Sequence, residues 1–250
     1  LIVAGAATAR TQANSIKVTA DMDAAQEVPQ PRGDVDNARG TFNATVTKSG
    51  NGAEMRWTLN WGALTGLAVA AHIHTGREGD AGGIAVPLCG PCTNPENGTA
   101  NLTAAQLAAL QNGGTYVNIH TVMNAAGEIR GQIGVASSFK ASMGARQEVP
   151  KPKGNVRRAR GTFRGTVVRV GPLAELTWQL NFSRLTGRAT AAHIHIAPRG
   201  SAGKVALALC GPCKSGVKRT VTIRRNLVLA LENGFAYVNV HTRRNKAGEI

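Results

Sequence analysis

The sequence predicts an all-β protein made of two tandem antiparallel β-sandwiches, each with one short helix. The clearest observation is a repeat, because Gln26-Glu27-Val28-Pro29 returns 121 residues later as Gln147-Glu148-Val149-Pro150. The composition agrees, since 30 Gly, 10 Pro and only 4% aromatic residues favour short strands and turns over a helical bundle. Short segments between the Gly-rich turns alternate apolar and polar residues, which is typical of half-buried strands.

The repeat covers almost the whole chain of 250 residues. A period this long indicates two complete domains, each large enough to bury a core, and not a solenoid. We place the domains at residues 14–134 and 138–250, joined by Val135-Ala136-Ser137. Further motifs recur at the same displacement, beginning at Gly40-Thr41-Phe42, Trp57, Leu64-Thr65-Gly66, Ala71-His72-Ile73-His74, Cys89-Gly90-Pro91-Cys92 and Tyr116-Val117-Asn118-Ile119-His120-Thr121.

The two ends of the chain suggest a piece of a secreted precursor. Residues 1–13 open with an apolar stretch followed by small residues, which is typical of a signal-peptide remnant or a flexible N-terminus. The second copy ends at Ile250, where the matching motif of the first copy continues past Ile129, so we expect a C-terminally truncated second domain. No apolar run approaches the roughly 20 residues of a membrane span.

The first strands are expected at Ser15–Met22 and Met55–Asn60, where apolar and polar residues alternate. Because side chains of a strand point to opposite faces in turn, one phase of each strand must face the core. The residues in this inward phase are Trp57, Leu59, Ile73, Val117, Ile119 and their counterparts in the second copy.

One helix per copy is expected between the later strands. In the first copy Thr103 can cap it, Gln106 stands at the capping-box position and Gly113 can end it. The second copy has Arg224 and Leu227 at the two capping positions. Its helix should therefore start less cleanly.

All six His of the chain lie in repeated motifs. A His-x-His pair on a strand places both imidazoles on one face, and the third His follows the same phase on another strand. If the two strands are neighbours, three imidazoles converge, which suits one copper or, as second choice, zinc ion per domain with a position left open. The candidate ligands are His72, His74, His120, His193, His195 and His241.

Two alternatives stay open around these histidines. They can form a hydrogen-bonded cluster without metal, since buried His is often satisfied by backbone groups. Glu128 and Glu249 lie eight residues beyond the third His of each copy. They can orient a ligand or form a structural ion pair.

Cys-Gly-Pro-Cys occurs in both copies but lacks the strand-to-helix context of a redox motif. We expect disulfides that close their own loops, Cys89 with Cys92 and Cys210 with Cys213. Catalytic thiol exchange and a cysteine-bound metal are the lesser alternatives. The sequence also offers no nucleophile beside a base, no phosphate-cradling loop and no nucleic-acid module.

The net charge of +15 is distributed unevenly. Residues 14–134 hold 7 Lys and Arg against 10 Asp and Glu, whereas residues 135–250 hold 21 against 4. This asymmetry predicts a surface for a polyanion in the second domain. Its candidate residues are Lys151, Lys153, Arg157, Arg158, Arg160, Arg164 and Arg169 in one cluster and Lys214, Lys218, Arg219, Arg224 and Arg225 in another. Candidate glycosylation sites are Asn43, Asn97, Asn101 and Asn181.

These motifs resemble the CHRD domain, the module repeated in chordin and found in many secreted proteins. The resemblance rests on Q-E-V-P, L-T-G, A-H-I-H, Y-V-N-[IV]-H-T and N-x-A-G-E-I-R-G, and it covers residues 17–134 and 138–250. It implies an extracellular β-sandwich module and no particular reaction.

A weaker likeness concerns the metal. Leu64-Thr65-Gly66, His72-Ile73-His74 and Gly79-Asp80 are similar to the copper-ligand strand and following loop of copper/zinc superoxide dismutase, a Greek-key sandwich. This likeness implies an immunoglobulin- or superoxide-dismutase-like topology, with His72 and His74 as metal ligands. Each copy has only three His, so the zinc site of that enzyme has no counterpart here.

Two functions of different class follow from the sequence. The leading hypothesis is a secreted binding or structural module whose second domain binds an acidic polysaccharide or another anionic extracellular surface, with other extracellular proteins as further partners. The alternative is a copper or zinc protein with one three-histidine site per domain, in which a position open to water, an oxygen species or a substrate would allow redox activity. We expect no nucleic-acid partner.

Overall fold

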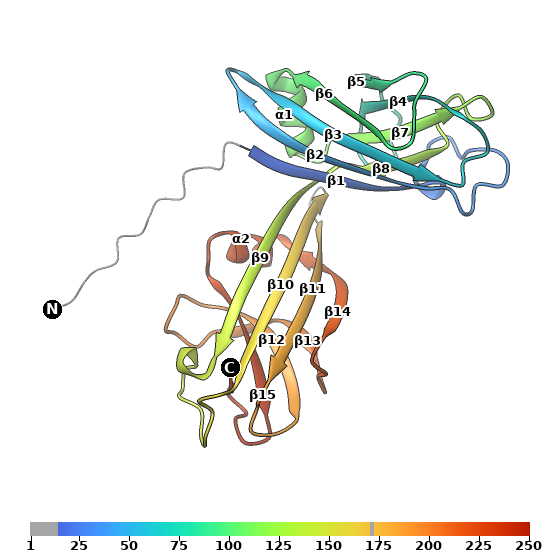
Figure 1. Cartoon of the computed structure of the whole chain (residues 1–250). Helices are drawn as coiled ribbons and strands as arrows, with labels where there is room; N and C mark the ends of the chain where they lie inside the picture. The colour runs from blue at the N-terminus through green and yellow to red at the C-terminus, as the bar shows by residue number, and fades with distance from the viewer. Residues whose placement is uncertain (1–14, 171–172) are drawn as a thin grey trace. The chain divides into compact units, whose positions relative to one another are not determined.

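The computed structural model describes residues 15–170 and 173–250, which form two units that divide between Val135 and Ala136. The expected signal-peptide remnant at 1–13 lies outside the described residues. Each unit consists of antiparallel strands and one short α-helix (Figure 1), which confirms the predicted fold class. The three residues expected to connect the domains, 135–137, belong to strand β9 (Gly134–Gly144).

The first unit is a sandwich of two antiparallel four-stranded layers. One layer has the order β6-β3-β2-β1 and the other β5-β4-β7-β8, and the layers meet where Asp23 of β1 pairs with Arg130 of β8. The elements are β1 (Ser15–Asp23), a 3₁₀ turn (Ala24–Gln26), β2 (Arg39–Ser49), β3 (Gly52–Gly62), β4 (Ala68–Thr75), β5 (Ile84–Cys89), β6 (Glu96–Leu102), α1 (Ala104–Gln111), β7 (Thr115–Thr121) and β8 (Ile129–Gln132).

The chain crosses between the two layers three times in this unit. It leaves the first layer after β3, returns from β5 to β6, and crosses again through α1 to β7. Strand β6 pairs with β3 and not with β5, which precedes it in the sequence, as in Greek-key sandwiches. The crossings place β4 and β7 side by side, with His72 opposite Asn118 and Ala70 opposite His120.

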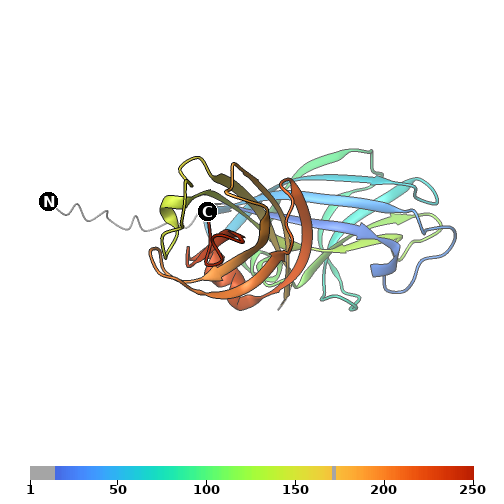
Figure 2. The same ribbon diagram turned by 90° about the horizontal axis from the view of Figure 1, so that it is seen from below.

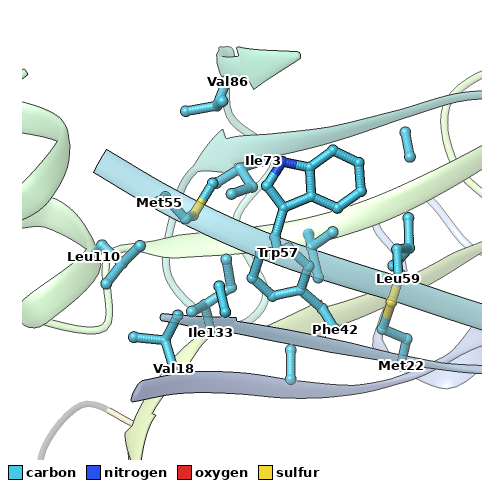
Figure 3. Close-up of a cluster of buried hydrophobic side chains, with 14 of the residues drawn as sticks. Val18, Met22, Phe42, Met55, Trp57, Leu59, Ile73, Val86, Leu110 and Ile133 are labelled. Atoms are coloured by element: carbon cyan, nitrogen blue, oxygen red, sulfur yellow. The ribbon is translucent and has the colours of Figure 1, made fainter. Parts of the chain in front are cut away.

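The core lies between the layers and contains the side chains that the alternation predicts (Figure 3). Trp57 packs there with Phe42 of β2 and Ile73 of β4, and all three are buried. Of the predicted core residues in the second unit, Val238 is only partly buried. Its counterpart Val117 pairs with Gly131 of β8.

The second unit repeats the arrangement, and Figure 2 shows its strands curving around a common interior. Strands β14-β11-β10-β9 form one layer and β13-β12-β15 the other. The remaining elements are a 3₁₀ turn (Ala145–Gln147), β10 (Arg160–Val170), β11 (Leu173–Ser183), β12 (Ala189–Ile196), β13 (Lys204–Cys210), β14 (Val217–Arg224), α2 (Arg225–Glu232) and β15 (Ala236–Thr242).

The two helices begin as their sequences predict. Thr103 accepts from the Gln106 backbone N–H, and the Gln106 side chain accepts from the Thr103 N–H, which completes a capping box. Helix α2 has no side-chain cap at Arg224. Neither helix of the described residues is long and apolar enough to cross a membrane.

Candidate metal centres

Three histidines gather on the outer face of β4 and β7 in the first unit. Alternation along β4 points His72 and His74 outward and buries Ile73 in the core. His120 stands on the neighbouring strand in the same phase. One possible ligand nitrogen from each ring lies within 4.8 Å of those of the other two. The predicted convergence of the three imidazoles is therefore present in the structure.

Backbone carbonyls fix which nitrogen of two rings is free. His74 Nδ1 donates to the Gly82 carbonyl at 2.9 Å, and His120 Nδ1 donates to the Ala125 carbonyl at 3.0 Å. A neutral ring that donates through Nδ1 has its lone pair on Nε2. His72 Nδ1 in turn lies 3.0 Å from His120 Nε2. Nitrogen atoms of histidines on two different strands, β4 and β7, therefore converge on one point.

The second unit contains the same arrangement. His193 Nδ1 lies 2.9 Å from His241 Nε2, and His195 Nδ1 contacts the Gly203 carbonyl at 2.9 Å. His241 Nδ1 contacts the carbonyl of Lys246, again at 2.9 Å. The rings of this unit also offer three nitrogens within 4.8 Å. The geometry has been kept although the charge of the two units differs greatly.

A hydrogen-bonded cluster without metal leaves one atom unsatisfied at the same place in both units. His74 Nε2 and His195 Nε2 are buried and have no hydrogen-bond partner among the described residues. Buried polar atoms without partners are rare and destabilising. An ion at the convergence point would accept both this lone pair and that of the third histidine.

Burial favours the neutral, metal-binding form of His72 and His120. Desolvation, together with the neighbouring His72 and His74, lowers the pKa of His120 from 6.5 to about 4, although its hydrogen bond to the Ala125 carbonyl opposes the shift. Desolvation also lowers the pKa of His72. Metal ions bind unprotonated imidazole, so the site is ready to bind at neutral pH.

A buried stack behind His74 was not predicted from the sequence. The Tyr116 ring is stacked on His74 with centroids 5.1 Å apart, and the central carbon of the Arg130 guanidinium lies over the Tyr116 ring, 3.4 Å from its centre. Arg130 is almost fully buried and donates to the carbonyls of Arg77 and Asp80. It thereby holds the loop whose Gly82 carbonyl orients His74. The available signal was the phase of Tyr116, which matches that of His120.

Glu128 forms a hydrogen-bonded hub and, among the described residues, no ion pair. It is fully buried and accepts from the Thr65 backbone and hydroxyl, the Thr121 hydroxyl and the Asn124 amide. Burial opposes its ionisation, but these hydrogen bonds lower its pKa overall. Glu249 has the same partners in the second unit. Both carboxylates fix the loop that follows the third histidine without contacting a ring.

A second pair of buried carboxyls was also missed. Burial raises the pKa of Glu27 to about 7, although the Arg130 charge opposes the shift, and burial likewise raises the pKa of Glu148 to about 7. Glu27 is 1% exposed, and one of its oxygens has no hydrogen-bond partner among the described residues. Their position in the Q-E-V-P motif was visible in the sequence, but their burial was not.

All four cysteines form the disulfides that were expected. Cys89 is bonded to Cys92 and Cys210 to Cys213. The Cys92 backbone N–H donates to the Ala68 carbonyl, which ties the small loop to the start of β4. The cysteines are therefore not thiol ligands for the histidine sites.

The candidate polyanion residues lie mainly in one loop and on two strands of the second unit. Lys151, Lys153, Arg157 and Arg158 lie in the segment before β10, and most of the others lie on β10 and β14. Arg164 pairs across the sheet with Gln179, which pairs with Lys218. Arg169 is paired with Glu232 at 3.3 Å and is only partly exposed. The structure therefore separates Arg169 from the exposed cations.

The candidate glycosylation residues of the first unit share one sheet face. Asn43 on β2 and Asn97 and Asn101 on β6 are exposed there. Asn181 on β11 is only partly exposed.

The fold and these sites define a tandem pair of β-sandwich domains, each with a three-histidine cluster on its outer face. The CHRD domain model matches residues 18–133 and 139–250, so the chain belongs to the CHRD family and contains two CHRD domains. CHRD domains are extracellular-type modules. No curated protein and no solved structure matches the chain.

Proposed function

We propose that each CHRD unit binds one transition-metal ion through its three histidines, with copper as the first choice and zinc as the second. The observation that carries this proposal is the buried, unpartnered Nε2 of His74 beside the lone pair of His120, repeated at His195 and His241. Three imidazole donors without thiolate or carboxylate suit copper and zinc.

The nitrogen spacing supports the proposal. Two nitrogens that bind one ion at about 2.0–2.1 Å are about 2.9–3.4 Å apart for angles between a right angle and a tetrahedral one. The His72–His120 and His193–His241 nitrogens are 3.0 and 2.9 Å apart. Three protein ligands leave a position for water or another ligand, where a bound ion would supply Lewis-acid or redox chemistry.

Elemental analysis of the full chain, purified without added metal and then dialysed against copper, tests the proposal. We expect about two equivalents in the parent, because it has two sites. The single variants His72→Ala and His193→Ala should each retain about one equivalent, and the double variant none. Each single variant is the matched control for the other. A parent chain that is free of metal and fails to bind copper at neutral pH would refute the proposal.

A second candidate function is polyanion binding by the second unit. Exposed Lys140, Arg164 and Lys218 border a shallow depression of about 430 Å³ on the outer face of β9, β10, β11 and β14. In the first unit Asn43 and Asn97 occupy the positions of Arg164 and Lys218. A row of cations across one sheet suits an acidic polysaccharide. We propose that the protein is secreted and binds such a polysaccharide outside the cell.

Heparin chromatography of the full chain tests this second candidate. Arg164→Gln/Lys218→Gln should elute at a lower salt concentration than the parent, because two contacts to the polyanion are lost. Lys17→Gln/Lys48→Gln removes the same charge from the first unit and should elute with the parent. If the two double variants shift equally, only net charge matters and this surface is not the binding site.

A further inference from the structure

The loop after the third histidine carries different charges in the two units, although its backbone makes the same hydrogen bond to that histidine in both. Val122, Met123 and Ala125 of the first unit become Arg243, Arg244 and Lys246 in the second. All six side chains are exposed, with Val122 at 84%. In both units this loop supplies the carbonyl that accepts from the third histidine.

A fourth position changes in the same way at the neighbouring strand. Exposed Leu67 precedes β4 in the first unit, and exposed Arg188 precedes β12 in the second. Ala189 pairs with Thr242, so Arg188 and Arg243 stand at adjacent strand ends. We call Arg188, Arg243, Arg244 and Lys246 the cationic rim. No ion pair involves these four residues within the described part of the chain.

The rim lies close to the histidine cluster. Arg243 is two residues beyond His241, which is about 7 Å along a strand. Lys246 contacts His241 directly through its carbonyl. A cation at the separation of Arg243 acts on the cluster with little screening, since the Debye length is about 8 Å at physiological ionic strength.

A neighbouring loop adds to the positive charge. The Arg244 guanidinium lies beside Gly154, and Asn245 exchanges two hydrogen bonds with the Lys153 backbone. Exposed Arg157 follows in that loop, where the first unit has Asp36. The two loops therefore present cations on the same side in the second unit, and mixed or apolar side chains in the first.

We propose that the metal site of the second unit binds an anionic oxygen ligand, a phosphate, sulfate or carboxylate group, at its open position, and that the first site discriminates against it. This inference rests on the proposed metal binding. Cations around a site raise the local concentration of anions and stabilise the bound anion. Both sites have the same three ligands, so we assign the difference to their surroundings, in which the rim is the largest change in charge.

The test uses full-length chains with one functional site each. His72→Ala/His120→Ala retains the second site, and His193→Ala/His241→Ala retains the first. Each is loaded with one equivalent of copper(II), and its electron paramagnetic resonance spectrum is followed during titration with phosphate. We expect the second-site form to respond at a phosphate concentration at least about tenfold lower. If an alanine pair does not fold, as judged by circular dichroism, His74→Gln or His195→Gln replaces it.

Exchanging residues between the units supplies the matched control. Arg243→Val/Arg244→Met, which installs the residues of the first unit, should move the phosphate midpoint of the second-site form towards that of the first. Lys17→Gln/Lys48→Gln removes equal charge from exposed positions of the first unit and should leave it in place. A sulfated oligosaccharide in place of phosphate distinguishes a polymer-borne group from a free anion, and a response to either supports the proposal.

The outcomes separate the inference from the proposed function. Absence of copper from both one-site forms contradicts metal binding, and the inference falls with it. Copper in both forms with equal phosphate midpoints, or a midpoint that the Arg243→Val/Arg244→Met exchange does not change, overturns the inference alone.

Discussion

At the scale of single residues, Glu128 shows how the third histidine is held without a direct contact. Its carboxylate accepts hydrogen bonds from Thr65 in the turn before β4, from Thr121 at the end of β7 and from Asn124 in the loop that follows. Because hydrogen bonds to a charged group are stronger than those between neutral groups, this hub stabilises the loop that carries the Ala125 carbonyl.

Replacing this carboxylate should destabilise the first unit. Glu128→Gln places an amide N–H₂ against donors and removes the charge, so we expect a loss of about 2 kcal/mol or more in the free energy of unfolding, measured with urea. Glu249→Gln should behave alike in the second unit. Glu54→Gln, at a partly exposed side chain paired with Arg56, should change stability by less than about 0.5 kcal/mol. Equal effects at Glu54 and Glu128 would contradict the role of the hub.

Glu27 and Glu148 should make stability fall as the pH rises. Their pKa values are raised from 4.5 to about 7, so the folded state favours the protonated form. Their contribution to stability is complete below pH 4.5 and is lost as the pH rises towards 7. The lowered histidine pKa values act in the opposite direction, with stability lost as the pH falls below 6.5.

Thermal unfolding of Glu27→Gln/Glu148→Gln between pH 5 and pH 8 isolates the carboxyl contribution, because the histidines are common to both proteins. The Tm of the variant relative to the parent should increase from pH 5 to pH 8. A difference in Tm that is constant across this range would show that neither carboxyl titrates as described. Glu78→Gln, on an exposed side chain, controls for loss of charge.

At the scale of secondary structure, the two helices form a natural comparison of capping. Thr103→Ala removes the capping box of α1 and should cost about 1 kcal/mol. Arg224→Thr supplies a side-chain acceptor to α2, which has none, and should raise stability by up to about 1 kcal/mol. Urea unfolding measures both. The two variants should change the free energy of unfolding in opposite directions. A loss of stability at both positions would contradict the capping explanation.

The strands and the histidine faces could be predicted because they follow from a period of two along the chain. The alternation at Ile73 and at Val117–Ile119 identified the core side of β4 and β7, and hence the face of all three rings. The ring tautomers could not be predicted, since they depend on loop carbonyls at Gly82 and Ala125. The stack of Arg130 on Tyr116 depends on the pairing of β8 with β7, which no local pattern reveals.

At the scale of the whole molecule, two copies of one fold carry opposite surface charge over a common internal plan. The repeated motifs contain the ligands, the hub carboxylates and the core, while most of the charge difference lies on exposed positions. Surface charge has little effect on which fold forms, so it can diverge while the core and the histidine clusters remain alike.

The carbonyl that orients the third histidine belongs to the main chain, and every residue type carries one. The exposed side chains of the segment after β7 and β15 can therefore change while ring geometry stays constant, as Ala125 and Lys246 already demonstrate. The exposed side chains of this segment can therefore be replaced in protein engineering. Libraries built at residues 243, 244 and 246 would vary the electric field at a fixed histidine cluster and leave its coordinating atoms untouched.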